Sequence, residues 1–132
     1  MTTLSVETRS RSAMVDVTQQ VQEVVTQSGV RNGVAVVFVP HTTAACTINE
    51  NADPDVQHDM LLTFDDLVPR HRQGYRHAEG NSDAHVKASL VGLSETVLID
   101  NGRLVLGTWQ GVYFVEFDGP RRRSLHVHIA PH

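Results

Sequence analysis

The C-terminal part of the chain most strongly constrains the fold, because it contains a strong hairpin signal. Asn101-Gly102 separates two short apolar segments, 94–100 and 103–107. Asn and Gly supply the two positive-φ positions of a type I′ turn, which joins neighbouring antiparallel strands. The sequence therefore predicts a two-stranded hairpin at this point.

The same part of the chain predicts a second hairpin. Gly119-Pro120 lies between two further alternating segments, 112–118 and 122–130. Runs of this kind that flank a turn are typical of paired strands. Four strands after residue 93 indicate a largely antiparallel sheet system.

Three helices and three further strands are predicted before residue 93. We expect strands at 3–10 (continuing through Val15 and Val17), at 33–40, and at 42–48, which returns after a short connection at His41. We expect helices to begin at Thr18, at Asp53-Pro54 and at Asn81 or Ser82, and to end near Ser28, Thr63 and Gly92. This order predicts a single α+β domain over residues 1–132, with largely antiparallel sheets and about three helices.

Composition narrows the classes of function. The chain has 132 residues, a formal net charge of −4 and one cysteine, Cys46, which we expect in the core. A mildly acidic chain has no general affinity for nucleic acid, and a lone cysteine excludes an internal disulfide. Because there is no apolar run as long as a membrane span and no signal peptide, we expect a cytoplasmic protein with no membrane partner.

The densest polar stretch is the segment 77–85. Asn81 and His85 are four residues apart and share a face of the predicted helix. The positive end of the helix dipole keeps His85 neutral and able to bind a metal ion, and the loop could bring His77 to the same ion. The alternative is a capped helix with two surface histidines.

A second polar group, His41-Thr42-Thr43, lies between two predicted strands. These side chains could supply a third metal ligand or an edge that binds an anion. The alternative is a turn whose hydroxyl groups satisfy the backbone.

Acidic residues surround the start of the second helix. Asp53 and Asp55 are explained as helix cap and first-turn charge. Glu50 and Asp59 have no such explanation, and either could bind a cation, orient a ligand histidine or act as a general base. Oxygen ligands of this kind would suit Mg²⁺ with a phosphate substrate.

Three arginines follow the second turn. Strand alternation places Arg121 and Arg123 on one face and Arg122 on the other. A guanidinium group can recognise phosphate or carboxylate, although a solvated strand end is the alternative. Trp109 could line a pocket or fill the core, and the sequence alone favours the core.

Three long motifs resemble the YjbQ family, also called UPF0047. In chain order they are VPHTTAACTINENADPDVQHDM, HAEGNSDAH and LVLGTWQGVYFVEFDGPRRR. The resemblance covers nearly the whole chain and implies an α+β fold, a homotrimer and a buried, metal-capable site of histidines. It also implies weak thiamine-phosphate-synthase activity. That reaction joins a hydroxymethylpyrimidine diphosphate to a thiazole phosphate and releases pyrophosphate.

The resemblance also indicates which residues form the site. We expect a divalent metal, zinc or magnesium, on His41, His77 and His85. We expect Glu50, Asp59 and Arg121 to be catalytic, and a small phosphorylated substrate to contact Thr42, Thr43, Asn81, Trp109 and Arg121.

Three functions are consistent with these residues. The first is the thiamine-phosphate-synthase-type transferase. The second is a metal-dependent hydrolase of a small substrate, in which a metal-bound water is activated. The third is a non-catalytic trimer that binds a metal ion or a small anion.

Overall fold

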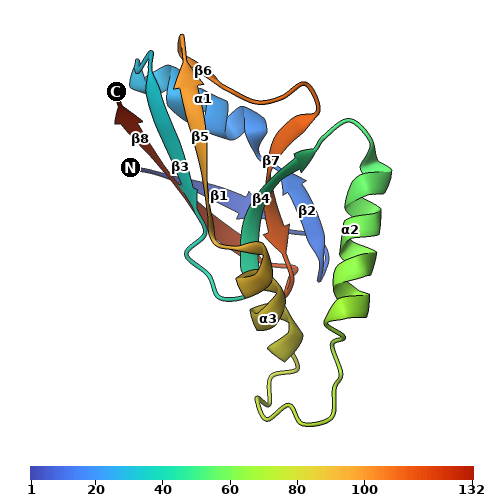
Figure 1. Cartoon of the computed structure of the whole chain (residues 1–132). Coiled ribbons are helices and arrows are strands. Elements are labelled where there is room, and N and C mark those ends of the chain that lie inside the picture. Colours follow the sequence, from blue (N-terminus) through green and yellow to red (C-terminus); the bar gives the residue numbers. More distant parts are fainter.

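Two antiparallel sheets and three helices make up the fold, in a computed structural model that describes residues 1–132 (Figure 1). The five-stranded sheet has the order β1 (Thr2–Glu7), β8 (Arg122–Pro131), β3 (Gly33–Phe38), β5 (Ser94–Asp100) and β6 (Arg103–Leu104). The three-stranded sheet has the order β2 (Ala13–Asp16), β7 (Gln110–Glu116) and β4 (Ala44–Glu50). The helices are α1 (Thr18–Ser28), α2 (Pro54–Leu67) and α3 (Ser82–Val91). This confirms the predicted α+β class.

The main core lies between the two sheets. Inward-facing residues of both sheets form one buried cluster, which includes Val37, Phe114 and Leu125. Val21 and Val24 of α1 complete this cluster. Apolar side chains that leave water at such an interface supply most of the favourable free energy of folding.

Cys46 illustrates how closely the sheets pack. The side chain is fully buried on β4, and its Sγ lies 3.9 Å from the backbone oxygen of Val37 on β3. Burial, with a smaller contribution from the charge of Glu95, raises the pKa of the thiol to about 12. The prediction of a core cysteine is confirmed.

The other face of the three-stranded sheet is covered by α3 and α2. Ala84 and Ala88 of α3 pack on Val115 and Phe117, and Phe64 of α2 packs against the same cluster. Small alanine side chains let the helix approach the sheet closely. This packing fixes the N-terminal end of α3 beside the end of β7, where the polar residues of the motifs gather.

Several local predictions are confirmed. Asn101 and Gly102 have φ of 53° and 76°, and β5 pairs with β6 across them. Asp53 caps α2, since its side chain accepts a hydrogen bond from the backbone of Asp55, and Pro54 is the first helical residue. However, α2 continues to Leu67 and does not end near Thr63.

Three predictions about strand connections are wrong. The strand expected over 3–10 and beyond is broken at residues 8–12, and β2 belongs to the other sheet. The strands expected at 33–40 and 42–48 also separate, because β3 and β4 lie in different sheets. For the same reason β7 and β8 do not form the hairpin predicted at Gly119-Pro120. Each short connection crosses from one sheet to the other, so its two strands face each other across the core.

Two further observations concern the exposure of Trp109 and the character of the helices. Trp109 is 62% exposed, so its predicted place in the core is wrong. No helix of the chain combines the length and the apolar character that crossing a membrane requires.

Candidate functional site

A polar cavity of about 620 Å³ lies between α3 and the chain crossing from β7 to β8. Apart from Pro40, every residue that lines it is polar: His41, Thr42, Thr43, Glu79, Asn81, His85, Asp118, Arg121 and Arg123. A more apolar groove of about 710 Å³ lies near Gly33 and Leu98 and contains none of the predicted site residues. We therefore take the polar cavity as the candidate functional site.

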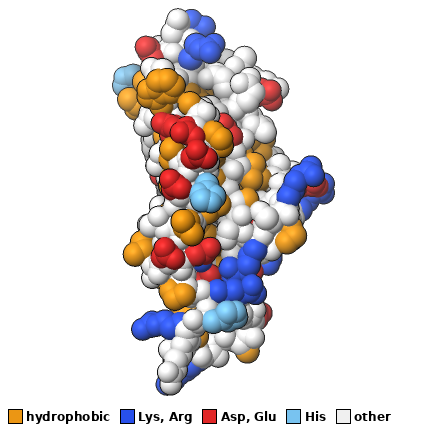
Figure 2. All heavy atoms as spheres, turned by 90° about the vertical axis from the view of Figure 1, so that its right-hand side faces the viewer, with side chains coloured by type: hydrophobic (Ala, Val, Ile, Leu, Met, Phe, Trp, Pro, Cys, Tyr) orange, Lys and Arg blue, Asp and Glu red, His pale blue; other side chains and the backbone are white.

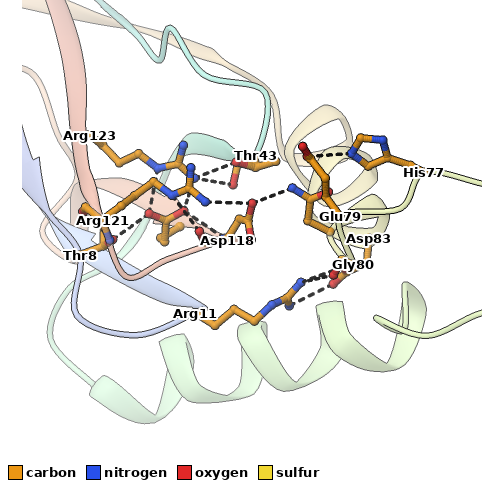
Figure 3. A network of polar contacts seen from close by, with 12 residues as sticks. Thr8, Arg11, Thr43, His77, Glu79, Gly80, Asp83, Asp118, Arg121 and Arg123 are labelled. Atoms are coloured by element: carbon orange, nitrogen blue, oxygen red, sulfur yellow. Dashed lines mark hydrogen bonds and ion pairs between the residues drawn. The ribbon is translucent and has the colours of Figure 1, made fainter.

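A buried ion pair forms the floor of the cavity. Arg123 is 4% exposed, and its Nε donates to Glu116 Oε1 at 2.9 Å while Nη2 donates to Glu116 Oε2. Nη2 also donates to the Oγ1 atom of Thr43 at 2.8 Å (Figure 3). Nη1 makes no hydrogen bond within the chain and is not sealed from solvent. Because Arg123 lines the cavity, Nη1 is the nitrogen of this side chain that a ligand could use as a donor.

Glu116 stays ionised because its surroundings are built for a carboxylate. Burial alone would raise its pKa, but hydrogen bonds from Arg123, from Thr8 Oγ1 and from the backbone of Asp118 lower it. The Thr8 hydroxyl also accepts from the backbone N–H of Arg121 at 3.0 Å. The floor thus has a fixed charge distribution before any ligand arrives.

A second chain of contacts runs from Arg121 to α3. Arg121 donates from Nε to the backbone oxygen of Asp118 and from Nη2 to Asp118 Oδ2 at 3.1 Å. The same Oδ2 accepts from Asn81 Nδ2 at 2.8 Å. The Oδ1 atom of Asn81 is buried and has no donor partner in the chain. A buried acceptor without a partner is costly, so a ligand or an ordered water that donates there would stabilise the site.

His41 lines the cavity from the segment that joins β3 to β4. Its Nε2 accepts a hydrogen bond from the backbone N–H of Ser124 at 2.9 Å. Burial, together with the positive charge of Arg123, holds the pKa of His41 below its ordinary value. The ring is therefore neutral at physiological pH.

The rings of His77 and His85 lie close together, but only His85 lines the cavity. Their ring centroids are 5.5 Å apart at an interplanar angle of 88°. Nε2 of His77 also lies 3.0 Å from Glu79 Oε2. The chain contains no group of three or more His, Cys, Asp or Glu side chains placed to hold a metal ion. The predicted three-histidine site is thus present only as this pair, and metal binding stays a prediction.

A buried network holds the start of α3 in place. Asp83 is fully buried, and both of its oxygens accept from Arg11, at 2.9 and 3.2 Å. Lys87 is also fully buried and donates to Asp83 Oδ2 at 2.8 Å and to Asp65 Oδ1 at 2.7 Å. Burial would raise the pKa of Asp83, but the hydrogen bonds from Arg11 and Lys87 lower it. This network positions Asn81 and His85, which line the cavity from one helix face as the sequence predicts.

Besides His77, three predicted site residues lie away from the cavity. Glu50 is at the far end of β4, Asp59 is on the exposed side of α2, and Trp109 precedes β7. None of them lines the polar cavity. Figure 2 views the molecule from the side of α2 and shows acidic side chains gathered over this face, with most Lys and Arg side chains below them or at the edge.

Sequence reasoning missed three residues that shape the cavity, namely Glu79, Glu116 and Asp118, and it considered Arg123 only as a possible anion-binding guanidinium without a partner. Glu116 is an acidic residue within an otherwise apolar run, 112–117. Because a charge in a buried strand needs a partner, this position was the available signal for a buried ion pair.

The arrangement of these motifs can be compared with known proteins. The family profile described as "UPF0047 protein YjbQ-like" matches residues 2–132. The chain belongs to the YjbQ-like family UPF0047. The matched range contains every residue that lines the cavity.

Relatives in this family are similar over most of their length. The UPF0047 protein YugU of Bacillus subtilis is 51% identical over 125 residues, which is 95% of each chain. A UPF0047 protein of Methanocaldococcus jannaschii is 51% identical over 94% of this chain and 89% of its own. A crystal structure from Clostridium acetobutylicum, titled an uncharacterized conserved protein of the YjbQ/UPF0047 family, has a TM-score of 0.96 and 52% identity. It covers 98% of this chain and 100% of the other, so these YjbQ-like chains share one fold.

Proposed function

We propose that this YjbQ-like protein is an enzyme that takes a phosphorylated small molecule into the polar cavity. The observation that carries the proposal is Arg123, which is almost fully buried, lines the cavity and has one guanidinium nitrogen, Nη1, without a partner in the chain. A buried guanidinium that is already fixed by Glu116 loses little conformational freedom when it binds a phosphoryl oxygen. Arg121 adds a second, half-exposed guanidinium at the same cavity.

The charges of the lining residues limit how the anion is held. Arg123 is paired with Glu116, and Arg121 is paired with Asp118. Besides these two pairs, Glu79 adds a further carboxylate to the lining, so the cavity has no excess of positive charge. We infer that directed hydrogen bonds, more than net charge, select a phosphoryl group here.

The reaction proposed is the one that the family resemblance implies. The C–O bond between the pyrimidine methylene and its diphosphate breaks, and the pyrophosphate leaves with the electron pair. A C–N bond then forms to the thiazole nitrogen, which carries no proton, so no general base is required. Arg121 and Arg123 would stabilise the charge that develops on the departing pyrophosphate.

A divalent ion was expected to assist this step. His77 and His85 are close enough to be candidate ligands of a zinc or magnesium ion. His41 does not fit as the third ligand as it is arranged, because its Nε2 accepts from Ser124. We therefore assign no step to a metal ion.

A metal-dependent hydrolase is the second candidate, and the paired rings of His77 and His85 favour it. A screen of phosphate and ester substrates with zinc-loaded protein tests it. Activity that is lost in His77→Ala would support this candidate.

The homotrimer and the cytoplasmic location also belong to the proposal. Mass photometry across a dilution series tests the trimer.

The direct test of the transferase is formation of thiamine phosphate from hydroxymethylpyrimidine diphosphate and thiazole phosphate. Loss of a charged donor to a phosphoryl group costs about 1.5–3 kcal/mol. We therefore expect Arg121→Gln to lower kcat/KM by roughly ten- to a hundredfold. Arg122→Gln is the matched control, since Arg122 pairs with Glu7 at the surface and does not line the cavity.

Two outcomes would contradict the transferase. Turnover of the wild-type protein no faster than in buffer contradicts the activity itself, and equal turnover in Arg121→Gln contradicts the assignment of that activity to this cavity. Tight binding of pyrophosphate without turnover would instead favour the non-catalytic anion-binding protein.

A further inference from the structure

The end of strand β3 leaves a backbone donor of β8 without its usual partner. In the β3–β8 ladder Phe38 lies opposite His126, so continuation of the register would place Pro40 opposite Ser124. The strand has ended by then, and the Ser124 N–H donates to Nε2 of His41 at 2.9 Å. The imidazole ring thus replaces a backbone carbonyl as the acceptor.

This hydrogen bond determines where the His41 ring carries its proton. A nitrogen that accepts a hydrogen bond is unprotonated, so in the neutral ring the proton is on Nδ1. Nδ1 has no hydrogen-bond partner in the chain and is not sealed from solvent. Since His41 lines the polar cavity, an N–H donor is available there.

We propose that His41 donates a hydrogen bond from Nδ1–H to the anion in the cavity, and that it is not a metal ligand. This inference rests on the proposed function, because it requires an anion at this place. It adds an oxyanion subsite made by the chain alone, for a phosphoryl or pyrophosphate group.

The second donor of this subsite is the Nη1 atom of Arg123. Arg123 directly precedes Ser124, so the start of β8 orients both donors. The side chain of Arg123 is held by Glu116, while the backbone of Ser124 holds the ring of His41. Two donors that are fixed before binding need little rearrangement to meet an oxyanion.

Coordination of a metal ion by His41 would disrupt this arrangement. Binding through Nε2 would leave the Ser124 N–H without its acceptor, and binding through Nδ1 would require that nitrogen to lose its proton. Both modes of coordination cost free energy, whereas binding of an anion to Nδ1–H leaves the hydrogen bond from Ser124 and the ring proton in place. The ring is therefore better suited to recognise an anion than a cation.

The experiment combines a spectrum with a titration, on chelator-treated full-length protein. Long-range ¹H–¹⁵N NMR of the histidine rings reports the tautomer of His41 directly and needs no variant. Calorimetric titration with inorganic pyrophosphate then compares wild type with two variants. His41→Asn keeps an amide donor near the position of Nδ1, and His41→Gln keeps an acceptor near Nε2 but loses the cavity donor.

We expect the Nδ1–H tautomer, and a His41 signal that shifts when pyrophosphate binds. We expect His41→Gln to bind pyrophosphate about tenfold more weakly, with His41→Asn closer to wild type. His128→Gln is the control and should bind pyrophosphate like the wild-type protein. His128 is exposed on β8, the strand that contains Ser124, and does not line the cavity. Zinc titration of His41→Asn should give the wild-type stoichiometry.

Three results would overturn the inference. They are an Nε2–H tautomer, pyrophosphate binding that is unchanged in His41→Gln, and zinc binding that is lost in His41→Asn. Each of these leaves the proposed function standing. If the wild-type protein does not bind pyrophosphate, the proposed function fails together with the inference.

Discussion

Strand β4 connects two regions that differ in how their polar side chains are held. At its Ala44 end, the cavity rests on a buried ion pair and a chain of hydrogen bonds from Arg121 to Asn81. At its Glu50 end, polar groups are more exposed, and the Asp59 carboxylate contacts only the neighbouring His58 ring. The two ends are separated by about 20 Å, since β4 has seven residues.

This difference explains why one continuous motif does not make one site. His41, Glu50 and Asp59 belong to a single stretch of sequence, but β4 places the acidic part at the opposite end of the sheet. Fixed polar groups are those that can stabilise charge without rearrangement. We therefore assign the chemistry to the Ala44 end.

The largest expected effect is on stability and comes from breaking the buried pair. Arg123→Met leaves the carboxylate of Glu116 buried without its main partner, and loss of one partner of a buried pair costs about 3–5 kcal/mol. Urea denaturation followed by circular dichroism measures this change. Arg122→Met, which removes an exposed pair with Glu7, should change the free energy of unfolding by less than about 1 kcal/mol. Equal losses in both variants would contradict a special role for the cavity floor.

Acid should have the next largest effect, because it weakens the same networks without removing any atom. Glu116 and Asp83 have folded-state pKa values below their ordinary ones. Their contribution to stability is complete above the unfolded pKa values, about 4.3 for Glu and 3.9 for Asp, and is lost as the pH falls through the folded values. Urea denaturation between about pH 3 and pH 6 should therefore show a falling free energy of unfolding below about pH 4.5.

A variant isolates the part of this acid effect that belongs to the cavity. Glu116→Gln lacks the carboxylate, so we expect a lower free energy of unfolding at neutral pH and a shallower decline toward acid. A decline as steep as in the wild-type protein would mean that other carboxylates control the acid response.

The smallest expected effect is at the Glu50 end. Trp109 is 62% exposed, so Trp109→Ala should change the free energy of unfolding by no more than about 0.5 kcal/mol. Pyrophosphate affinity should also be unchanged, because Trp109 does not line the cavity. A fall in turnover at unchanged stability would show instead that the two ends of β4 act together.

Local signals in the sequence predicted local structure well. Asn101-Gly102 and Asp53-Pro54 each have a conformational preference that depends on only two residues. The turn at Asn101-Gly102 and the start of α2 at Asp53-Pro54 are both where the sequence predicts them. The shared face of Asn81 and His85 follows from helical periodicity alone. Such features need no knowledge of the tertiary fold.

Connections and long-range pairs were not predictable in this way. Gly119-Pro120 has the local character of a hairpin, yet the strands on either side belong to different sheets. The partner of Arg123 is Glu116, and the two meet only because β7 and β8 face each other across that crossing. The orientation of the His41 ring depends on the backbone N–H of Ser124, which lies 83 positions away and has no strand partner on that side. No sequence motif indicates this contact.

The burial of Cys46 has a practical consequence for experiments on this protein. A thiol with a pKa of about 12 is almost entirely protonated at neutral pH, and maleimides and iodoacetamides react with the thiolate. The single native cysteine should therefore remain unlabelled while the protein is folded. A cysteine introduced at Thr42, which is exposed at the cavity wall, would then be the one reactive thiol. A fluorophore attached there would report on the cavity without first removing the native cysteine, and labelling of Cys46 itself would serve as a signal of unfolding.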